Sequence, residues 1–486
     1  MSEGLALLSV GAILAASILV ALGAARTGFP VLVAFLGLGM LLGSDGPGGI
    51  EFDDASLTRQ AGTVGLGLIL YEGGLQTSWR RLREVVVPAA LLSTVGVVVS
   101  TLVTGAAAHE LFDLSWLESV LLGAVVASTD AAAVFSTLRF THIRRRLART
   151  LEAESGGNDP MAIALTLGFI AWIERPRSYG FGDLSLLVVR QIGLGLLVGV
   201  ALGMVATWVF ARIPESIGAF APVASVAAAA LSFGAADTIG GSGFLAVYLV
   251  GLAVGSTPSR YRSQLAAFHE GIAFVAQVVL FVLLGLLVFP HELPHVALPG
   301  LALAFLLMLV ARPAAVLVST SFGAFTHRDR LLLGWAGLRG AVPIVLATFV
   351  LSSKVDHSKT IFNAVFFVVI VSTLVQATTL EQVARRLGLT AAVPPAAGTG
   401  GAGEDPLSQL DRVEFVVSGN HAINGSAVRE LGLPRDALVA LIQRDAEAIP
   451  PRGSTIVEEG DRLFILAPRQ RQHDLEDVFT RWRRLI

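Results

Sequence analysis

Apolar runs of about 20 residues recur from the N-terminus to about residue 380, and a helix of that length spans the hydrocarbon core of a bilayer. Short polar connections separate the runs, and we count about 13 apolar runs. Hydrophobic residues make up 54% of the chain and charged residues only 15%, which is unusually apolar for a soluble domain. The sequence therefore predicts an all-α polytopic membrane domain over residues 1–389.

The connections between the apolar runs alternate in charge. Those that start at Arg26, Trp79, Arg139, Arg260 and His327 are basic, whereas SDGPGGIEFDD, HELFDLSW and PHELPH are acidic or nearly neutral. Because cytoplasmic loops carry the excess of Lys and Arg, the pattern predicts an N-terminus outside the cell and a C-terminal domain in the cytoplasm. That topology requires an odd number of spans.

An odd number of spans permits two inverted repeats around one linking helix, a common plan in transporters. The segment 117–138 would then correspond to 330–351. The second segment contains GWAGLRGAVP, whose glycines and proline predict a broken helix. The first has Thr129 and Asp130 at the equivalent place but no proline, so its break is only weakly indicated. We expect two broken helices that cross.

The composition changes after residue 389. Residues 390–406 read as a flexible linker rich in Pro, Gly and Ala, and residues 407–486 read as a small cytoplasmic α+β domain. The elements of that domain follow from its apolar pattern: strands at 413–417, 437–444 and 462–467, and short helices at 424–433 and 471–482.

Two aspartates lie in polar clusters within apolar runs. Asp130 follows Thr129, and Asp159 follows Ser155 and Asn158. Their carboxylate, amide and hydroxyl oxygens suit a hard cation rather than a transition metal, and an acid inside a membrane marks a functional site by default. Either a proton or a cation can neutralise Asp159, but not both. This competition is the minimum requirement for ion/proton exchange.

Structural roles for these acids stay open at this stage. Asp130 and Asp159 could instead cap helix starts or pair with basic residues. Glu72, in LYEGGL, is a third acid within an apolar run. With two glycines beside it, a helix-end role and a cation-binding role are equally supported.

Arg339 and Arg312 are cations within apolar runs. An unpaired guanidinium would be strongly unfavourable there, so Arg339, in the interrupted segment, requires a carboxylate partner. Glu154 precedes Asp159 by about one and a half helical turns and lies on a different face, which makes it the predicted partner. Arg312 precedes a proline, and the sequence indicates no partner for it.

Other chemistries are excluded or disfavoured. The chain has no cysteine, so thiolate sites are excluded, and its net charge of −2 argues against nucleic acid as a partner. His291 and His295 fit an H-E-x-x-H pattern, but Pro294 prevents the continuous helix that a zinc site needs. We find no nucleophile–base pair and no nucleotide-binding loop, so neither an enzyme nor a cofactor is predicted.

Several motifs carry a resemblance to a known family. Residues 5–385 resemble cation/proton antiporters of the sodium/proton-exchanger-like branch, and in particular the bacterial potassium/proton antiporter subgroup. In that subgroup TDAAAVF replaces a Thr-Asp-Pro motif, so Ala131 takes the place of a proline. The signature elements are Glu154-Ser155-x-x-Asn158-Asp159, Thr129-Asp130, Gly337-Leu338-Arg339-Gly340-Ala341, GGSGFLAVYLVGL (240–252) and FVAQVVLFVLLGLLV (274–288).

This resemblance implies that Asp159 is the essential ion- and proton-binding carboxylate and that Glu154 and Arg339 form a structural ion pair. It also implies a homodimer in the bacterial plasma membrane, with a core domain that rocks against a dimerisation domain. Asn158 stands where the electrogenic branch has an aspartate, which favours electroneutral one-for-one exchange. The residues that would complete the cation site are Asp130, Thr129, Ser155, Asn158 and Glu72.

The segment 410–486 resembles the C-terminal domain of the TrkA/RCK regulators of potassium channels and transporters. The resemblance implies control of transport by an ion or a small nucleotide, through modules paired in the dimer. A domain that only clamps the dimer together stays open as the alternative.

We expect a secondary antiporter that exchanges K⁺, or else Na⁺, for H⁺ by alternating access. The subgroup and the TrkA-like module favour K⁺, and a Na⁺(Li⁺)/H⁺ antiporter of the same fold is the nearest alternative. A potassium channel-like conductance gated by the C-terminal module would need a selectivity filter. The sequence contains no TVGYG-like loop.

Overall fold

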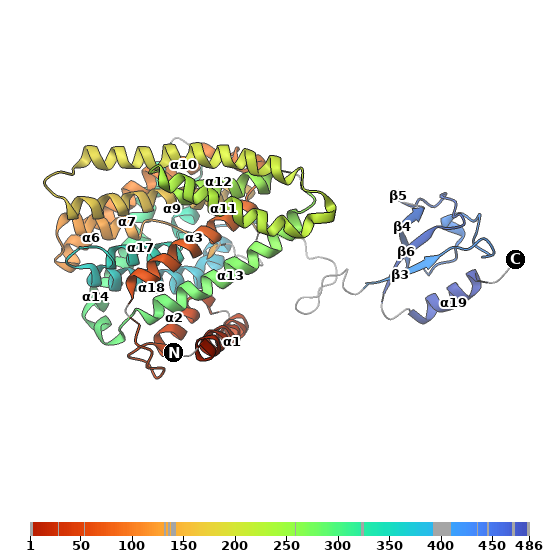
Figure 1. Ribbon diagram of the computed structural model, residues 1–486, viewed down its shortest axis with the longest axis horizontal. Coiled ribbons are helices and arrows are strands. Elements are labelled where there is room, and N and C mark those ends of the chain that lie inside the picture. The colour runs from red at the N-terminus through yellow and green to blue at the C-terminus, as the bar shows by residue number, and fades with distance from the viewer. Residues whose placement is uncertain are drawn as a thin grey trace. The chain divides into compact units, whose positions relative to one another are not determined.

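The computed structural model divides the chain into two compact units, residues 1–393 and 394–486 (Figure 1). Most of the predicted linker, from residue 392 to 406, lies outside the described residues. The described residues are 3–27, 29–52, 54–130, 133–134, 137, 142–257, 259–321, 325–391, 410–434, 436–444, 447–468 and 472–483.

Among the described residues of the N-terminal unit, the regular secondary structure is helical apart from one short β ribbon and one isolated bridge between Gly43 and Ile50. A π-helical turn joins α5 to α6 (η1, Leu92–Gly96) and α14 to α15 (η4, Leu307–Ala311). The helices are α1 (Glu3–Thr27), α2 (Val31–Leu42), α3 (Ala55–Gln76), α4 (Trp79–Leu82), α5 (Val86–Leu91), α6 (Val97–Phe112), α7 (Trp116–Val125), α9 (Arg145–Glu174), α10 (Phe181–Phe210), α11 (Ala221–Thr238), α12 (Gly243–Ser256), α13 (Arg262–Leu286), α14 (Leu293–Leu306), α15 (Arg312–Ser319), α16 (His327–Trp335), α17 (Ala341–Leu351) and α18 (Ser358–Arg386).

Six helical stretches in the described residues are long and apolar enough to cross a membrane, judged by length and composition. This finding agrees with the predicted helical membrane domain. The stretches are Val86–Phe112, Phe181–Phe210, Ile217–Thr238, Arg262–Leu286, Pro290–Ser319 and Ser358–Arg386.

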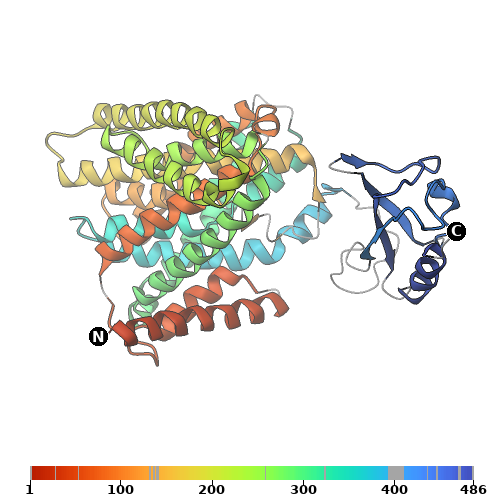
Figure 2. The same ribbon diagram turned by 45° about the vertical axis from the view of Figure 1, so that its right-hand side comes forward.

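The helices pack in two groups, and α9 contacts both. In one group α12 packs against α3, α10 and α11, and α13 packs against α2 and α3. In the other, α6 packs against α7, and α18 packs against α14 and α17. A Cβ atom at Gly74 would lie 2.3 Å from the carbonyl oxygen of Tyr248, so α3 and α12 touch backbone to backbone. Figures 1 and 2 show α1 beside α2 at the edge of this unit.

Two helices are interrupted in the same way. α7 ends at Val125 and α16 ends at Trp335, and in each case the next five residues, 126–130 and 336–340, are not helical. The break is therefore as complete in the first half as in the second, although only the second carries a proline. Ala131, where the wider family has that proline, lies outside the described residues.

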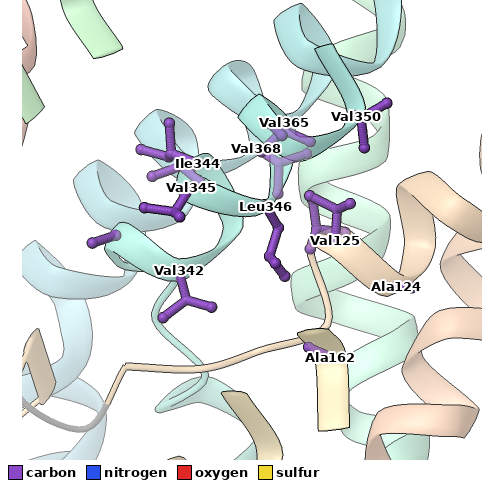
Figure 3. Close-up of a cluster of buried hydrophobic side chains, with 14 of the residues drawn as sticks. Ala124, Val125, Ala162, Val342, Ile344, Val345, Leu346, Val350, Val365 and Val368 are labelled. Atoms are coloured by element: carbon purple, nitrogen blue, oxygen red, sulfur yellow. The ribbon is translucent and has the colours of Figure 1, made fainter. Parts of the chain in front are cut away.

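Apolar side chains from several helices surround the interruptions (Figure 3). Val125 at the end of α7, Leu346 of α17 and Ala162 of α9 belong to one buried cluster together with Val365 and Val368 of α18. This cluster offers the half-helices only apolar contacts, so the polar backbone groups of the breaks need partners elsewhere.

A short antiparallel ribbon ties the start of α9 to the end of α18. Its strands are β1 (His142–Ile143) and β2 (Thr390–Ala391). The amide of Arg144 also donates to the carbonyl of Leu389 over 3.2 Å. The N-terminal end of α9 is therefore attached to the segment that leads into the linker.

The C-terminal unit contains a four-stranded antiparallel sheet in the order β3-β6-β4-β5. The predicted strands are confirmed as β3 (Leu410–Val416), β4 (Leu438–Arg444) and β6 (Arg462–Pro468), and the predicted terminal helix as α19 (Gln472–Trp482). The sequence reading missed the short strand β5 (Glu447–Ile449).

The predicted helix at 424–433 is wrong. Only Val428–Glu430 forms a turn of 3₁₀-helix there. Gly425 and Gly432 adopt positive φ angles of 82° and 65°, and backbone groups of the segment bond instead to residues 453–457, as in Gly425 N–H to Val457 C=O over 2.8 Å. Tertiary pairing thus overrides the local helical pattern.

A half-buried ion pair joins the end of β4 to the residue that precedes β6. Arg444 donates from Nε and Nη2 to the carboxylate of Asp461, both over 2.8 Å, and Asp461 is fully buried. Burial alone would raise the pKa of Asp461, but the hydrogen bonds from Arg444 and from the Glu458 amide outweigh it, and they hold that pKa below its usual value.

Removing this pair is expected to destabilise the C-terminal unit. Asp461→Asn or Arg444→Ala should cost about 1.5–3 kcal/mol, the range for hydrogen bonds to charged groups. Because the folded-state pKa of Asp461 is lowered, the contribution is present at neutral pH and disappears as the pH falls through that pKa. Calorimetry of the full chain at neutral and acidic pH should show a smaller acid-induced loss in Asp461→Asn than in wild type. Equal losses would contradict the assignment.

Candidate ion-binding site

The site is built on α9, which runs without interruption from Arg145 to Glu174. Glu154, Asn158 and Asp159 are buried in its interior, with exposed fractions of 1%, 1% and 5%. Because the helix begins well before these residues, the possibility that Asp159 caps a helix start is wrong. Pro160 follows within the same helix and removes one backbone donor beside the site.

Asn158 connects α9 to the first interruption. Its Nδ2 group donates to Thr129 Oγ1 over 2.7 Å and to the Thr129 carbonyl over 3.4 Å. Oδ1 of Asp130 accepts from the Ala133 amide over 3.1 Å, so this oxygen has the capping role considered for Asp130, whereas Oδ2 lies toward Gly340. Oδ1 of Asp159, by contrast, is buried and has no hydrogen-bond partner among the described residues.

The two interrupted segments contact each other directly. The amide of Asp130 donates to the carbonyl of Leu338 over 2.8 Å. Nη1 of Arg339 donates to the carbonyl of Ala127 over 2.6 Å and also to that of Ser128. A Cβ atom at Gly340 would lie 1.9 Å from Oδ2 of Asp130, so only glycine allows this approach.

The predicted ion pair between Glu154 and Arg339 is wrong. Glu154 instead forms a bidentate pair with Arg312: Nη2 donates to Oε2 over 2.9 Å and Nη1 donates to Oε1. Arg339 instead donates from Nη1 to backbone carbonyls of the other interruption, and its Nη2 group is buried without a hydrogen-bond partner among the described residues. The sequence places Glu154 near Asp159 and two arginines within apolar runs, and residue types alone do not decide which arginine pairs with Glu154.

The two π turns, η1 and η4, lie next to residues that bind Glu154. The hydroxyl of Ser93, in η1, donates to the backbone carbonyl of Glu154 over 3.0 Å, and Arg312 directly follows η4. π turns inside α-helices often occur at functional sites. Here they place two partners against the same residue of α9.

One cavity of about 690 Å³ joins most of the predicted site residues. Glu72, Thr129, Asp130, Ser155 and Asp159 all line it, whereas Asn158 does not and acts through Thr129. The sequence analysis missed four further uncharged polar residues in the lining, Gln76, Thr77, Tyr248 and Gln277. The available signal was that polar side chains occur within or at the end of apolar runs.

The cavity extends along α9 toward its N-terminal end. Arg145 and Arg149 also line it, with Arg81 and Glu152 beside them. Arg145 and Asp159 are about 20 Å apart along the helix axis, at 1.5 Å per residue. Glu72 lies in the last turns of α3 and accepts a hydrogen bond from Gln76, so its position fits either of the roles considered for it.

A double-mutant cycle separates the observed ion pair from the predicted one. Glu154→Gln or Arg312→Gln alone leaves one buried charge unpaired and should cost about 3–5 kcal/mol. The double variant Glu154→Gln/Arg312→Gln should be clearly less destabilised than the sum of the two single variants. Glu154→Gln combined with Arg339→Gln should instead be close to additive. Melting temperatures in detergent provide the measurement, and strong coupling only to Arg339 would contradict the structure.

Comparisons with known proteins agree with this architecture. The family model described as sodium/hydrogen exchanger, transmembrane, matches residues 12–386, and the TrkA-C domain model matches residues 412–480. The sodium proton antiporter MjNhaP1 from Methanocaldococcus jannaschii, a solved structure, matches with a TM-score of 0.72 and 23% identity, covering 80% of this chain and 99% of that chain. This likeness shows the same fold.

Full-length relatives give the same result. The K(+)/H(+) antiporter NhaP2 of Shewanella sp. (strain ANA-3) is 38% identical over 477 residues, which cover 97% of this chain and 83% of the relative. The K(+)/H(+) antiporter NhaP of Alkalimonas amylolytica is 37% identical over 489 residues, with 98% and 83% covered. The resemblance predicted from the motifs is confirmed: this chain belongs to the sodium/hydrogen exchanger family and carries a TrkA-C domain.

Proposed function

We propose that this protein exchanges K⁺ for H⁺ across the bacterial plasma membrane and that the two ions compete for Asp159. The proposal rests on the environment of the Asp159 carboxylate. This group is buried, lines the cavity and has one oxygen without a hydrogen-bond partner among the described residues. A charged group so placed requires neutralisation. A proton does this in one state and a cation in the other.

The other residues of the site have supporting roles in this proposal. Asp130, Thr129, Ser155 and Glu72 supply further oxygens around the cation, and all of them line the same cavity as Asp159. Oxygen type alone does not separate K⁺ from Na⁺, because selectivity depends on cavity size and ligand number. The names of the two relatives favour K⁺, and Na⁺(Li⁺)/H⁺ exchange is the alternative.

One-for-one exchange is supported by two residues near Asp159 on α9 that do not exchange a proton. Glu154 is occupied by Arg312, and position 158 holds a neutral amide that binds Thr129. Asp159 is then the group that alternates between proton and cation, so one positive charge moves in each direction. We therefore propose electroneutral transport.

Basic residues at one end of the cavity support a particular orientation of the protein in the membrane. Arg81, Arg145 and Arg149 line that end, and arginines gather on the cytoplasmic side of membrane proteins. We infer a cavity open to the cytoplasm, about thirteen spans as the apolar runs predict, and an outer N-terminus with a cytoplasmic C-terminal domain as the loop charges predict. Alternating access would then move α9 and the crossing segments relative to the α3–α12 group, within a homodimer.

Asp159→Asn is expected to abolish exchange while the protein still folds. The substitution keeps the size of the side chain and removes the group that is neutralised in turn by proton and cation. Proteoliposomes that carry a pH-sensitive dye should show dequenching on addition of K⁺ with wild type and none with the variant. Parallel additions of Na⁺ and Li⁺ determine which cation is exchanged.

Asp237→Asn is the matched control, because Asp237 is an exposed acid outside the cavity lining. It should exchange at the wild-type rate. Asp159→Asn that melts like wild type and still couples a K⁺ gradient to proton movement would remove Asp159 from the site.

A chain that stops after Val393 should still transport. The truncation removes the C-terminal unit but keeps both strands of the β1–β2 ribbon and the Leu389–Arg144 contact at the start of α9. We expect retained exchange with an altered dependence on ions or on small nucleotides, measured by the same dequenching assay. A truncated protein that folds but does not transport would instead give the C-terminal unit a direct part in transport.

A further inference from the structure

Tyr248 carries a polar group that the site described above does not use. It lies in α12, and its side chain is only 7% exposed. Its hydroxyl oxygen is buried and forms no hydrogen bond of normal geometry among the described residues, although the Thr77 side chain lies nearby in the same cavity lining. Leaving a buried hydroxyl unpaired is unfavourable. A ligand in the cavity would provide this hydroxyl with a polar partner.

The phenol group reaches the site helix at a glycine. A Cβ atom at Gly156 would lie 2.2 Å from Cζ of Tyr248 and 2.4 Å from its hydroxyl oxygen. Only glycine at this position lets the ring lie directly on α9. Gly156 precedes Asp159 by three residues, and residues at that spacing share one face of a helix. The hydroxyl is thus about one helical turn from the Asp159 side chain, and both residues line the same cavity.

A rigid support holds the phenol in this position. α12 packs backbone to backbone on α3 through Gly74 and Gly251, where a Cβ at Gly251 would lie 2.3 Å from the Tyr71 carbonyl. Glycine contacts of this kind fix two helices closely. Tyr248 therefore projects from one helix group onto the site helix, with its hydroxyl at the cavity.

We propose that Tyr248 is a cation-binding residue: its hydroxyl oxygen contacts K⁺ beside Asp159, directly or through one retained water molecule. The inference rests on the proposed exchange function and adds a ligand to it. A partly desolvated cation needs several oxygen ligands to replace its hydration shell. A neutral hydroxyl supplies one of them without adding a second proton-exchanging group. It therefore increases the affinity for the cation and leaves the stoichiometry unchanged.

Tyr248→Phe tests the role of the oxygen, because it keeps the ring. In dequenching assays the K⁺ concentration for half-maximal exchange should rise by about fivefold, the effect of one lost hydrogen-bond-strength contact. The maximal rate should stay within about twofold of wild type. Tyr179→Phe is the matched control, since its hydroxyl is also buried without a described partner but lies outside the cavity lining. It should leave both values unchanged.

A binding measurement separates this inference from the transport function. K⁺ should raise the melting temperature of detergent-solubilised wild type, because a ligand that binds only the folded state stabilises it. The midpoint of that titration should move to higher K⁺ in Tyr248→Phe. An unchanged midpoint and an unchanged half-maximal concentration would overturn the proposal, as would a variant that only melts earlier. If wild type binds K⁺ but does not exchange it, the proposed function fails instead.

Gly156→Ala gives a second, independent test. The added methyl group would collide with the ring and displace the hydroxyl from the site, so the half-maximal K⁺ concentration should rise. In the double variant with Tyr248→Phe, Gly156→Ala should raise the half-maximal K⁺ concentration little further, because the hydroxyl oxygen is already absent. Fully additive effects would show that Gly156 acts without the hydroxyl and would contradict the proposed contact.

Discussion

Backbone groups in a membrane must be satisfied by the protein itself, and this constraint governs the crossing of the two interrupted segments. Each interruption frees carbonyl and amide groups that a continuous helix would pair. The side chain of Arg339 pairs some of these groups, because its Nη1 donates to the carbonyl oxygens of Ala127 and Ser128 in the opposite interruption. Its own carbonyl accepts from the hydroxyl of Thr373 over 3.1 Å. One guanidinium thus joins the two halves of the protein.

The charges near the crossing are divided between fixed and exchangeable groups. Glu154 is held from both sides, by Arg312 at its carboxylate and by Ser93 at its carbonyl. These contacts anchor α9 about one and a half turns before Asp159. Asp159 has no such partner at Oδ1 among the described residues. A firmly anchored helix that carries an unpaired acid is suited to bind and release a small ion at a fixed place.

The sequence was informative where residue type determines chemistry. Acids and hydroxyls within apolar runs identified Asp159, Thr129 and Ser155, and the structure places these three residues around one cavity. The pairing of Glu154 could not be predicted, because it depends on which of two arginines the fold brings close. Tyr248 was passed over, since an aromatic residue in an apolar run is ordinarily part of the core.

The same distinction applies to the fold. Helices of the membrane domain follow from long apolar runs, and the sheet of the C-terminal unit follows from short alternating strands. The break after Val125 has no proline that would reveal it in the sequence. Hydrogen bonds from the other half stabilise this break instead. Likewise, the segment 424–433 pairs with residues 453–457 rather than forming a helix. In both places long-range contacts, invisible in the local pattern, decide the structure.

The central claim is that a proton and K⁺ compete for one carboxylate. The most direct test is the K⁺ concentration for half-maximal exchange, measured in proteoliposomes over a series of pH values. Because a metal ion binds only the deprotonated ligand, competition predicts that this concentration rises with acidity, approaching about tenfold per pH unit. The maximal rate at saturating K⁺ should change little. A half-maximal concentration that does not change with pH would show that the two ions bind at separate sites and would contradict the account.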